Sequence, residues 1–262
     1  PRVDLRLVVQ RAMLATWHAV GTSERSLLTL CDVGLACGLL LLLAPYSGTY
    51  VLKCAQPMGV AVAWWIYLLL KRLCREFLNL QWDALLLEAA VLAWPVSFHG
   101  ILPASVPPTI WVLQLCTFKL LFSSGVVKLR SGCKHWRQLT AMTLHYETQP
   151  LPHMFSWFAH GLPESLQRVS AFVCLVIELP IPLLIFATPL PAIGDGCRLV
   201  AFASFSGLMT LIMLTGNYGF FNQLTVILSI SLLSDQQLDT ILGGGAESDG
   251  PSAETTAVYA LQ

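Results

Sequence analysis

The sequence predicts an all-α protein, a multi-pass transmembrane helical bundle with about five to seven membrane helices and with interfacial or re-entrant segments. Two observations predict this class. Hydrophobic residues make up 55% of the 262 residues and charged residues only 11%, whereas soluble globular domains carry about 25% charged residues. In addition, apolar runs long enough to cross a bilayer core about 30 Å thick recur along the chain.

Six apolar runs are candidate membrane helices, and together they define a transmembrane domain over residues 27–235. Residues 1–26 hold four arginines among apolar residues and are expected to form an interfacial lead-in. Residues 236–262 are polar and Gly-rich, which is typical of a flexible tail. A central polar loop is expected at 130–165, with an amphipathic segment at 153–163 that suits a membrane interface. The six runs are 27–44, 57–73, 109–129, 166–187, 199–214 and 220–233.

Charged residues inside these runs are candidates for a functional or structural polar cluster. An unpaired charge at the centre of a membrane helix costs about 2.5 to 3.5 kcal/mol on insertion scales. Lys119 lies midway along the third run and Glu178 lies in the fourth. We therefore expect each of them to meet a polar partner or a wet cavity rather than lipid. Lys128 and Arg130, at the end of the third run, can extend toward the interface.

Two further carboxylates, Asp83 and Glu88, lie in the string EFLNLQWDALLLEAAVLAWP. Five residues on an α-helix correspond to a rotation of about 140°, so the two side chains point apart and do not form an acid–base dyad. Asp83 is placed to cap a helix over 84–94, because a carboxylate stabilises a helix N-terminus.

The central loop carries a polar pentad made of His145, Tyr146, Glu147, Thr148 and Gln149. Pro150 and Pro152 follow and are expected to stiffen its exit. We expect the pentad to be held against the helix bundle, with Glu147 paired to a basic residue, for which Lys128 and Arg130 are the nearest candidates in sequence.

A second polar segment, TGNYGFFN, joins the last two apolar runs and contributes Asn217 and Asn222. Its glycines and asparagines favour a tight turn between two helices.

Several classes of function are disfavoured by the composition and the motifs. The formal net charge is zero and there is no basic tract, which argues against nucleic-acid binding. Four histidines and Cys133 lie in the central region, but their spacing matches no ligand pattern, so neither a metal nor another cofactor is expected. No nucleophile elbow, zinc-protease, phosphate-loop or dinucleotide fingerprint occurs. His145 and Glu147 suit either acid–base chemistry or a polar network that joins helices, and both remain open.

Four strings occur in order between residues 76 and 238: FLNLQWDALLLE, FKLLFSSGVVKLRSGCKHW, LTAMTLHYETQPLP and LTGNYGFFNQLT. They closely resemble the lipase maturation factor family. Within that family, SSGVVKL, HYETQPLP and TGNYGFFN are more similar to the second paralogue than to the first.

The resemblance implies a multi-pass protein of the endoplasmic reticulum membrane that assists folding and assembly of secreted proteins, above all lipases such as lipoprotein lipase. The implied partners are the lipid bilayer and client proteins in the lumen. The family also carries a C-terminal lumenal domain, and this chain, which begins at Pro1, is expected to be a piece of the longer protein. A distant resemblance to the membrane helices of the vitamin K-dependent carboxylase suggests an alternative, an integral membrane enzyme that uses the polar cluster around His145 and Glu147.

Overall fold

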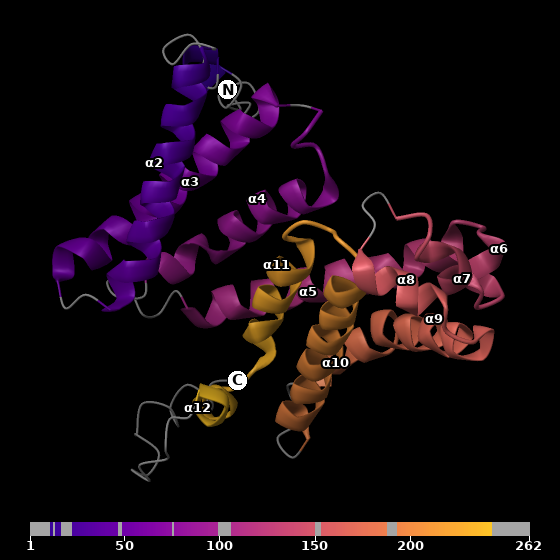
Figure 1. Ribbon diagram of the computed structural model, residues 1–262. Helices are drawn as coiled ribbons and strands as arrows, with labels where there is room; N and C mark the ends of the chain where they lie inside the picture. Colours follow the sequence, from indigo (N-terminus) through magenta and orange to yellow (C-terminus); the bar gives the residue numbers. More distant parts are fainter. Residues whose placement is uncertain are drawn as a thin grey trace, which may run out of the picture.

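The computed structural model describes residues 11–12, 14–16, 23–46, 49–74, 76–98, 106–149, 153–187 and 193–242. These residues form α- and 3₁₀-helices, and no strand occurs among them. Five segments of this part of the chain are long and apolar enough to cross a membrane, namely Glu24–Leu43, Tyr50–Leu73, Pro108–Arg130, Glu164–Ala187 and Gly194–Thr215. A shorter apolar helical segment covers Phe221–Leu232. The predicted class, an all-α multi-pass transmembrane bundle, is therefore confirmed (Figure 1).

The N-terminal unit is an antiparallel hairpin of α2 (Glu24–Leu43) and α3 (Tyr50–Leu73), joined through the 3₁₀ turn η1 (Ala44–Tyr46) (Figure 1). The Ser23 hydroxyl caps α2 by accepting a hydrogen bond from the Ser26 N–H at 3.2 Å. No residue of α2 is buried, as suits a helix whose outer surface faces lipid. α3 begins seven residues before the predicted run, since Pro57 lies inside the helix and not at its start.

The third helical layer is α4 (Gln81–Ala93), which continues into the 3₁₀ segment η2 (Trp94–Phe98) and runs antiparallel to α3 (Figure 1). Two tryptophan indoles form hydrogen bonds between the two helical segments. Trp64 Nε1 donates to the Leu87 carbonyl at 3.1 Å, and Trp94 Nε1 donates to the Pro57 carbonyl at 2.9 Å. Both carbonyls belong to helix backbones, so the indoles hold α3 and α4 in one register.

The central helix of the molecule is α5 (Val106–Arg130), which contributes to both hydrophobic clusters of the described residues. Leu113 and Cys116 pack with residues of α4 and α11 in one cluster, and Leu121 packs with residues of α9 and α10 in the other. A partly buried hydrogen bond adds to these contacts, because Gln114 Nε2 donates to the Ser231 carbonyl at 2.7 Å.

The predicted central loop folds into three short helices: α6 (Lys134–Arg137), α7 (Ala141–His145) and α8 (Met154–His160). The next span is divided into α9 (Glu164–Glu178) and the 3₁₀ segment η4 (Ile181–Ala187). The division falls at Pro180 and Pro182, where proline removes backbone donors and disfavours a continuous α-helix.

The C-terminal part consists of α10 (Gly194–Thr215), α11 (Phe221–Ser229), η5 (Ile230–Leu232) and α12 (Asp235–Leu242). α11 lies against α10, α5 and α4, so the turn between α10 and α11 is brought over the middle of the bundle (Figure 1). Helix α12 extends into the segment expected to be a flexible tail, and 243–262 lie outside the described residues. Most of the expected lead-in, 1–10 and 17–22, also lies outside them.

Candidate functional site

The two polar segments singled out in the sequence meet in space. The Tyr218 hydroxyl lies 3.1 Å from His145 Nε2, and the two rings are parallel to within 4°. Gln149 Nε2 donates to the Thr215 carbonyl, the last residue of α10, at 2.9 Å. We call this contact between 145–149 and 215–223 the polar junction. It confirms that His145 and Gln149 are held against the bundle.

Two glycines permit this close approach. A Cβ at Gly216 would lie 2.5 Å from Gln149 Oε1 and 2.7 Å from the Tyr218 ring, far inside van der Waals contact. Gly219 has φ +56°, a left-handed conformation that glycine adopts without strain, and it lies over the Trp82 indole. The two glycines of TGNYG are therefore required by the geometry of the junction.

Burial keeps the junction neutral. It lowers the pKa of His145 below its usual value, and the positive charge of Lys128 lowers this pKa further. Burial also raises the pKa values of the Tyr218 and Tyr146 phenols. In the hydrogen bond between the Tyr218 hydroxyl and the neutral His145 imidazole, the tautomer of His145 decides which group donates.

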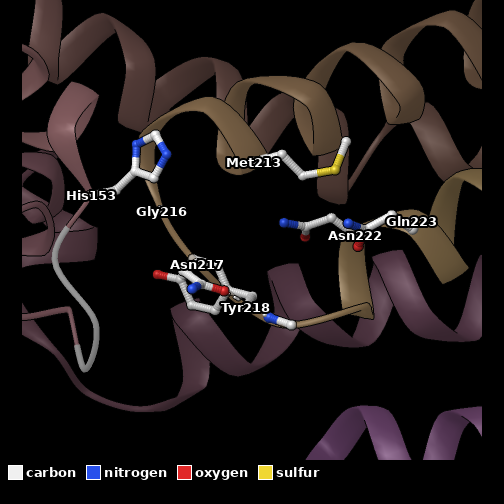
Figure 2. A pocket seen from close by; sticks show the side chains of 8 residues that line it. His153, Met213, Gly216, Asn217, Tyr218, Asn222 and Gln223 are labelled. Carbon is white, nitrogen blue, oxygen red and sulfur yellow. Dashed lines mark hydrogen bonds between the residues drawn. The ribbon is translucent and has the colours of Figure 1, made fainter.

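A cavity of about 230 Å³ adjoins the junction (Figure 2). Its polar lining comes from His153, Asn217, Tyr218, Asn222 and Gln223, and Met213 and two glycines complete it. Asn222 is 1% exposed, and its Oδ1 has no hydrogen-bond partner among the described residues. Both predicted asparagines therefore border one cavity.

The strongest ion pair joins α5 to α9. Lys128 Nζ contacts both carboxylate oxygens of Glu178 at 2.6 Å and lies 5.2 Å from the centre of the Trp136 ring. The side chains are 21% and 5% exposed, respectively. Gly125 allows the helices to approach, because a Cβ there would lie 2.8 Å from the Leu179 side chain. The prediction that Glu178 meets a polar partner is confirmed.

The two carboxylates of α4 point to different partners, as the helical spacing predicted. Asp83 is buried, accepts from the Tyr67 hydroxyl at 2.6 Å, and accepts from the Leu80 N–H at 2.8 Å. It therefore caps α4 and also ties α4 to α3. Glu88 forms an ion pair with Lys119 of α5, which confirms that Lys119 has a polar partner. This second pair is largely exposed, at 56% for Lys119 and 43% for Glu88.

Neither Lys128 nor Arg130, the nearest candidates in sequence, pairs with Glu147; the basic side chain that faces it is His160. Lys128 is engaged by Glu178, and Arg130 is exposed at the end of α5. The Glu147 side chain is 52% exposed, and its Oε2 lies 3.9 Å from His160 Nε2. Sequence proximity favoured Lys128, but the close contact between α5 and α9 at Gly125 brings Glu178 to it instead.

Several residues of these networks were not predicted individually. Tyr67 and His153 lie in none of the strings singled out above, and Gly125 lies in SSGVVKL without a signal for its role. All three roles depend on contacts between helices that are distant in sequence. Tyr218 lies within the TGNYGFFN string, where the φ-permissive glycines on either side of it were the available signal.

The described residues contain no group of three or more His, Cys, Asp or Glu side chains that could hold a metal ion. What they contain is a neutral hydrogen-bonding surface beside a cavity, supported by ion pairs between helices. A surface of this kind can bind a polar group.

Comparison with known proteins decides the family. The family model described as the lipase maturation factor transmembrane domain matches residues 5–240, most of the chain. The chain belongs to the lipase maturation factor family. The matched domain includes both polar segments and all five spans described above.

Relatives named lipase maturation factor 2 are more similar to this chain than those named lipase maturation factor 1. The chicken lipase maturation factor 2 is 41% identical over 225 residues, which cover 82% of this chain and 31% of the relative. The human lipase maturation factor 2 is 41% identical over 73% of this chain and 28% of its own length. The bovine lipase maturation factor 1 is 29% identical over 80% of this chain and 36% of its own length.

The chain thus spans about a third of the length of the curated relatives it matches. No solved structure matches it.

Proposed function

We propose that this protein assists the folding and assembly of secreted proteins, lipases among them, as a multi-pass protein of the endoplasmic reticulum membrane. Membership of the lipase maturation factor family carries the proposal, since the family's transmembrane domain matches residues 5–240. In this role the helix bundle is a rigid support, and the client binds at a surface that the bundle presents.

Helix α8 supplies a suitable client surface. Its exposed side chains include Trp157 at 74% exposure, together with Phe155 and Phe158, and its N-cap residue His153 lines the cavity. Exposed aromatic groups bind unfolded or partly assembled proteins because they bury a large apolar area at low conformational cost. In this proposal α8 faces the lumen, where secreted clients fold.

A membrane enzyme is the second candidate, and the cavity beside the neutral His145–Tyr218 pair is the observation that favours it. Catalysis requires an acid and a base that converge on one site. The Glu147 side chain is exposed, and neither Glu147 nor His145 is among the residues that line the cavity. The client-binding function is therefore better supported.

The test uses the full-length protein in cells from which the endogenous copy has been deleted. A Phe155→Ser, Trp157→Ser double variant is expected to keep normal abundance and ER location while the secretion of an active lipase reporter falls several-fold. The matched control is Phe172→Ser on α9, whose side chain is also exposed but lies in a span.

Unchanged lipase secretion from the α8 variant at normal abundance would reject client binding at this helix. If His145→Gln and Glu147→Gln instead abolished a turnover while client binding persisted, the enzyme would replace the client-binding function.

A further inference from the structure

The ion pair between Lys119 and Glu88 lies at the depth of the bilayer centre, yet it faces outward. Lys119 is the middle residue of the span Pro108–Arg130, and Glu88 of α4 contacts it there. The two side chains are 56% and 43% exposed, respectively. Charged side chains within membrane spans almost always face the interior of a bundle or a water-filled cavity, because hydrocarbon does not solvate them. In the bilayer we therefore expect this part of the surface to be covered.

The pair also leaves hydrogen-bonding groups unused. An ammonium group carries three N–H donors, and a carboxylate has two acceptor oxygens. Among the described residues, Lys119 Nζ donates to Glu88 Oε1 alone, and no donor contacts Glu88 Oε2. Lys128, in contrast, contacts both carboxylate oxygens of Glu178. The exposed pair thus presents two N–H donors and one acceptor oxygen to the surface that covers it, and hydrocarbon can satisfy none of them.

The surface around the pair has the pattern of a helix-packing interface. Residues that are three or four apart share one face of a helix. Both helices expose residues at these spacings, and we call them together the α4–α5 stripe: Ala84, Glu88 and Val91 on α4, and Leu115, Lys119 and Ser123 on α5. Ala84 and Ser123 are small, and small residues allow another membrane helix to approach closely.

A second copy of the same surface supplies the groups that the pair lacks. A two-fold axis brings two identical surfaces together, and when it is parallel to the membrane normal each residue keeps its depth. The stripe carries one positive and one negative side chain at the same depth, so it is complementary to itself. Across such an axis, Lys119 of each copy can donate to Glu88 of the other copy, and each unused acceptor oxygen receives a donor.

We propose that the α4–α5 stripe is the interface of a two-fold symmetric dimer of this protein in the bilayer. The interface encloses two lysines and two glutamates, whose charges sum to zero, so that neither ion pair faces lipid. The ion pair within each copy forms without the dimer. The dimer adds hydrogen bonds between the copies and removes the pair from hydrocarbon.

The experiment measures dimerisation of the full-length protein in membranes. Labelled protein is reconstituted in large liposomes at a series of protein-to-lipid ratios, and the dimer fraction is counted by single-molecule photobleaching. Lys119→Met and Glu88→Leu each remove both hydrogen bonds between the copies. Each variant should weaken dimerisation about tenfold, because one hydrogen bond between membrane helices contributes a factor of about three on average.

Mixing the two variants tests whether the ion pairs form between copies. A Lys119→Met copy retains Glu88, and a Glu88→Leu copy retains Lys119. A mixed dimer therefore rebuilds one ion pair across the interface, whereas dimers of like copies bring equal charges together. With the variants labelled in two colours, we expect mixed dimers to exceed the proportion that random pairing gives. A role of the ion pair within a single chain cannot produce this preference.

Two further variants complete the test. Ala84→Trp adds bulk to the stripe without changing a charge and should also reduce the dimer fraction, so it decides if a charge variant fails to fold. Arg168→Met breaks the exposed Glu164–Arg168 pair of α9, away from the stripe, and should leave the dimer fraction unchanged.

A parent protein that is monomeric at every protein-to-lipid ratio would overturn the proposal, and lipid or another part of a longer chain would then cover the pair. Random pairing of the mixed variants, or a dimer fraction that Ala84→Trp does not change, would overturn it as well.

Discussion

Helix α5 carries two lysines that are paired with carboxylates in different surroundings. Lys128 and Glu178 are 21% and 5% exposed, make two contacts at 2.6 Å, and lie against Trp136. Lys119 and Glu88 are 56% and 43% exposed and make one contact. The same chemistry therefore occurs once between packed helices and once on the outer surface of the bundle.

The difference shows where an ion pair determines the fold. Removing one partner of a buried pair leaves the other as an uncompensated charge, whereas an exposed pair loses little when it is broken. The Lys128–Glu178 pair thus fixes the position of α9 on α5. The Lys119–Glu88 pair mainly neutralises a charge at the middle of a span.

The largest effect is expected for Glu178→Ala. This substitution leaves the partly buried Lys128 ammonium without its counter-ion and should lower the free energy of unfolding by about 3 to 5 kcal/mol. Thermal unfolding of the purified protein in detergent measures this change. As a control, Lys128→Met combined with Glu178→Leu removes both charges and should recover most of the loss. If the free energy of unfolding of Glu178→Ala were within about 1 kcal/mol of that of the parent protein, the ion pair would not be what holds α9 against α5.

Gly125→Ala tests the packing that brings the buried pair together. The added methyl would lie 2.8 Å from Leu179 and 3.0 Å from Glu178 Cβ, so α5 and α9 must separate. We expect the free energy of unfolding to fall by about 1 to 3 kcal/mol, the usual cost of overpacking, in the same thermal unfolding assay. Gly207→Ala on α10, where a Cβ meets nothing within 4 Å, is the matched control and should be near neutral. Equal stability of the two variants would contradict the close contact.

The charge of Lys128 also reaches the polar junction, and the pH dependence of stability reports this. The folded protein holds the pKa of His145 below its usual value of about 6.5, so the unfolded chain binds the proton more tightly. Stability from this group is therefore complete above about pH 6.5 and is lost as the pH falls toward the folded-state pKa. Protonation also leaves His145 Nε2 only as a donor in its contact with the Tyr218 hydroxyl.

Melting temperatures at pH 7.5 and 5.5 test this sign. The melting temperature of the parent protein should be lower at pH 5.5 than at pH 7.5. This decrease should be smaller in His145→Gln, whose side chain does not titrate, and the same as in the parent in His135→Gln, a variant of an exposed histidine of α6. A parent protein that becomes more stable on acidification through this range would refute the assignment.

The smallest effect is expected for Lys119→Met. Because the Lys119–Glu88 pair is exposed, removing it should lower the free energy of unfolding in detergent by about 1 kcal/mol or less. The same variant should be measured in nanodiscs beside Glu178→Ala. A loss in the bilayer as large as that of Glu178→Ala would erase the contrast between the two pairs and would mean that another protein surface covers the α4–α5 face.

Much of the fold could be predicted because hydrophobic length is a local property. All five spans and the shorter helix 221–232 coincide with predicted runs. Helix starts are less predictable. The helix expected over 84–94 begins at Gln81, and α3 begins seven residues before Pro57, which lies inside the helix. Pro180 and Pro182, in contrast, break the fourth span into α9 and η4. The same residue type is tolerated or disruptive according to the neighbouring helices.

The candidate site was predictable only in part. The sequence identified His145, Gln149, Asn217 and Asn222, and the structure places all four around the polar junction and its cavity. The two candidates nearest in sequence, Lys128 and Arg130, are not the partners of Glu147, because sequence distance cannot reveal that α9 approaches α5 at Gly125 and brings Glu178 to Lys128. Pairing between helices depends on such non-local contacts.

The two pairs also differ in the order in which their partners are synthesised. Glu88 precedes Lys119 by 31 residues, so its carboxylate is already present when α5 leaves the ribosome. Glu178 follows Lys128 by 50 residues, which at about 5 to 20 residues per second amounts to roughly 3 to 10 seconds of translation. During that interval Lys128 has no Glu178 to neutralise it. Until then the Lys128 ammonium can extend to the membrane interface, and the close contact between α5 and α9 forms only after α9 has been synthesised.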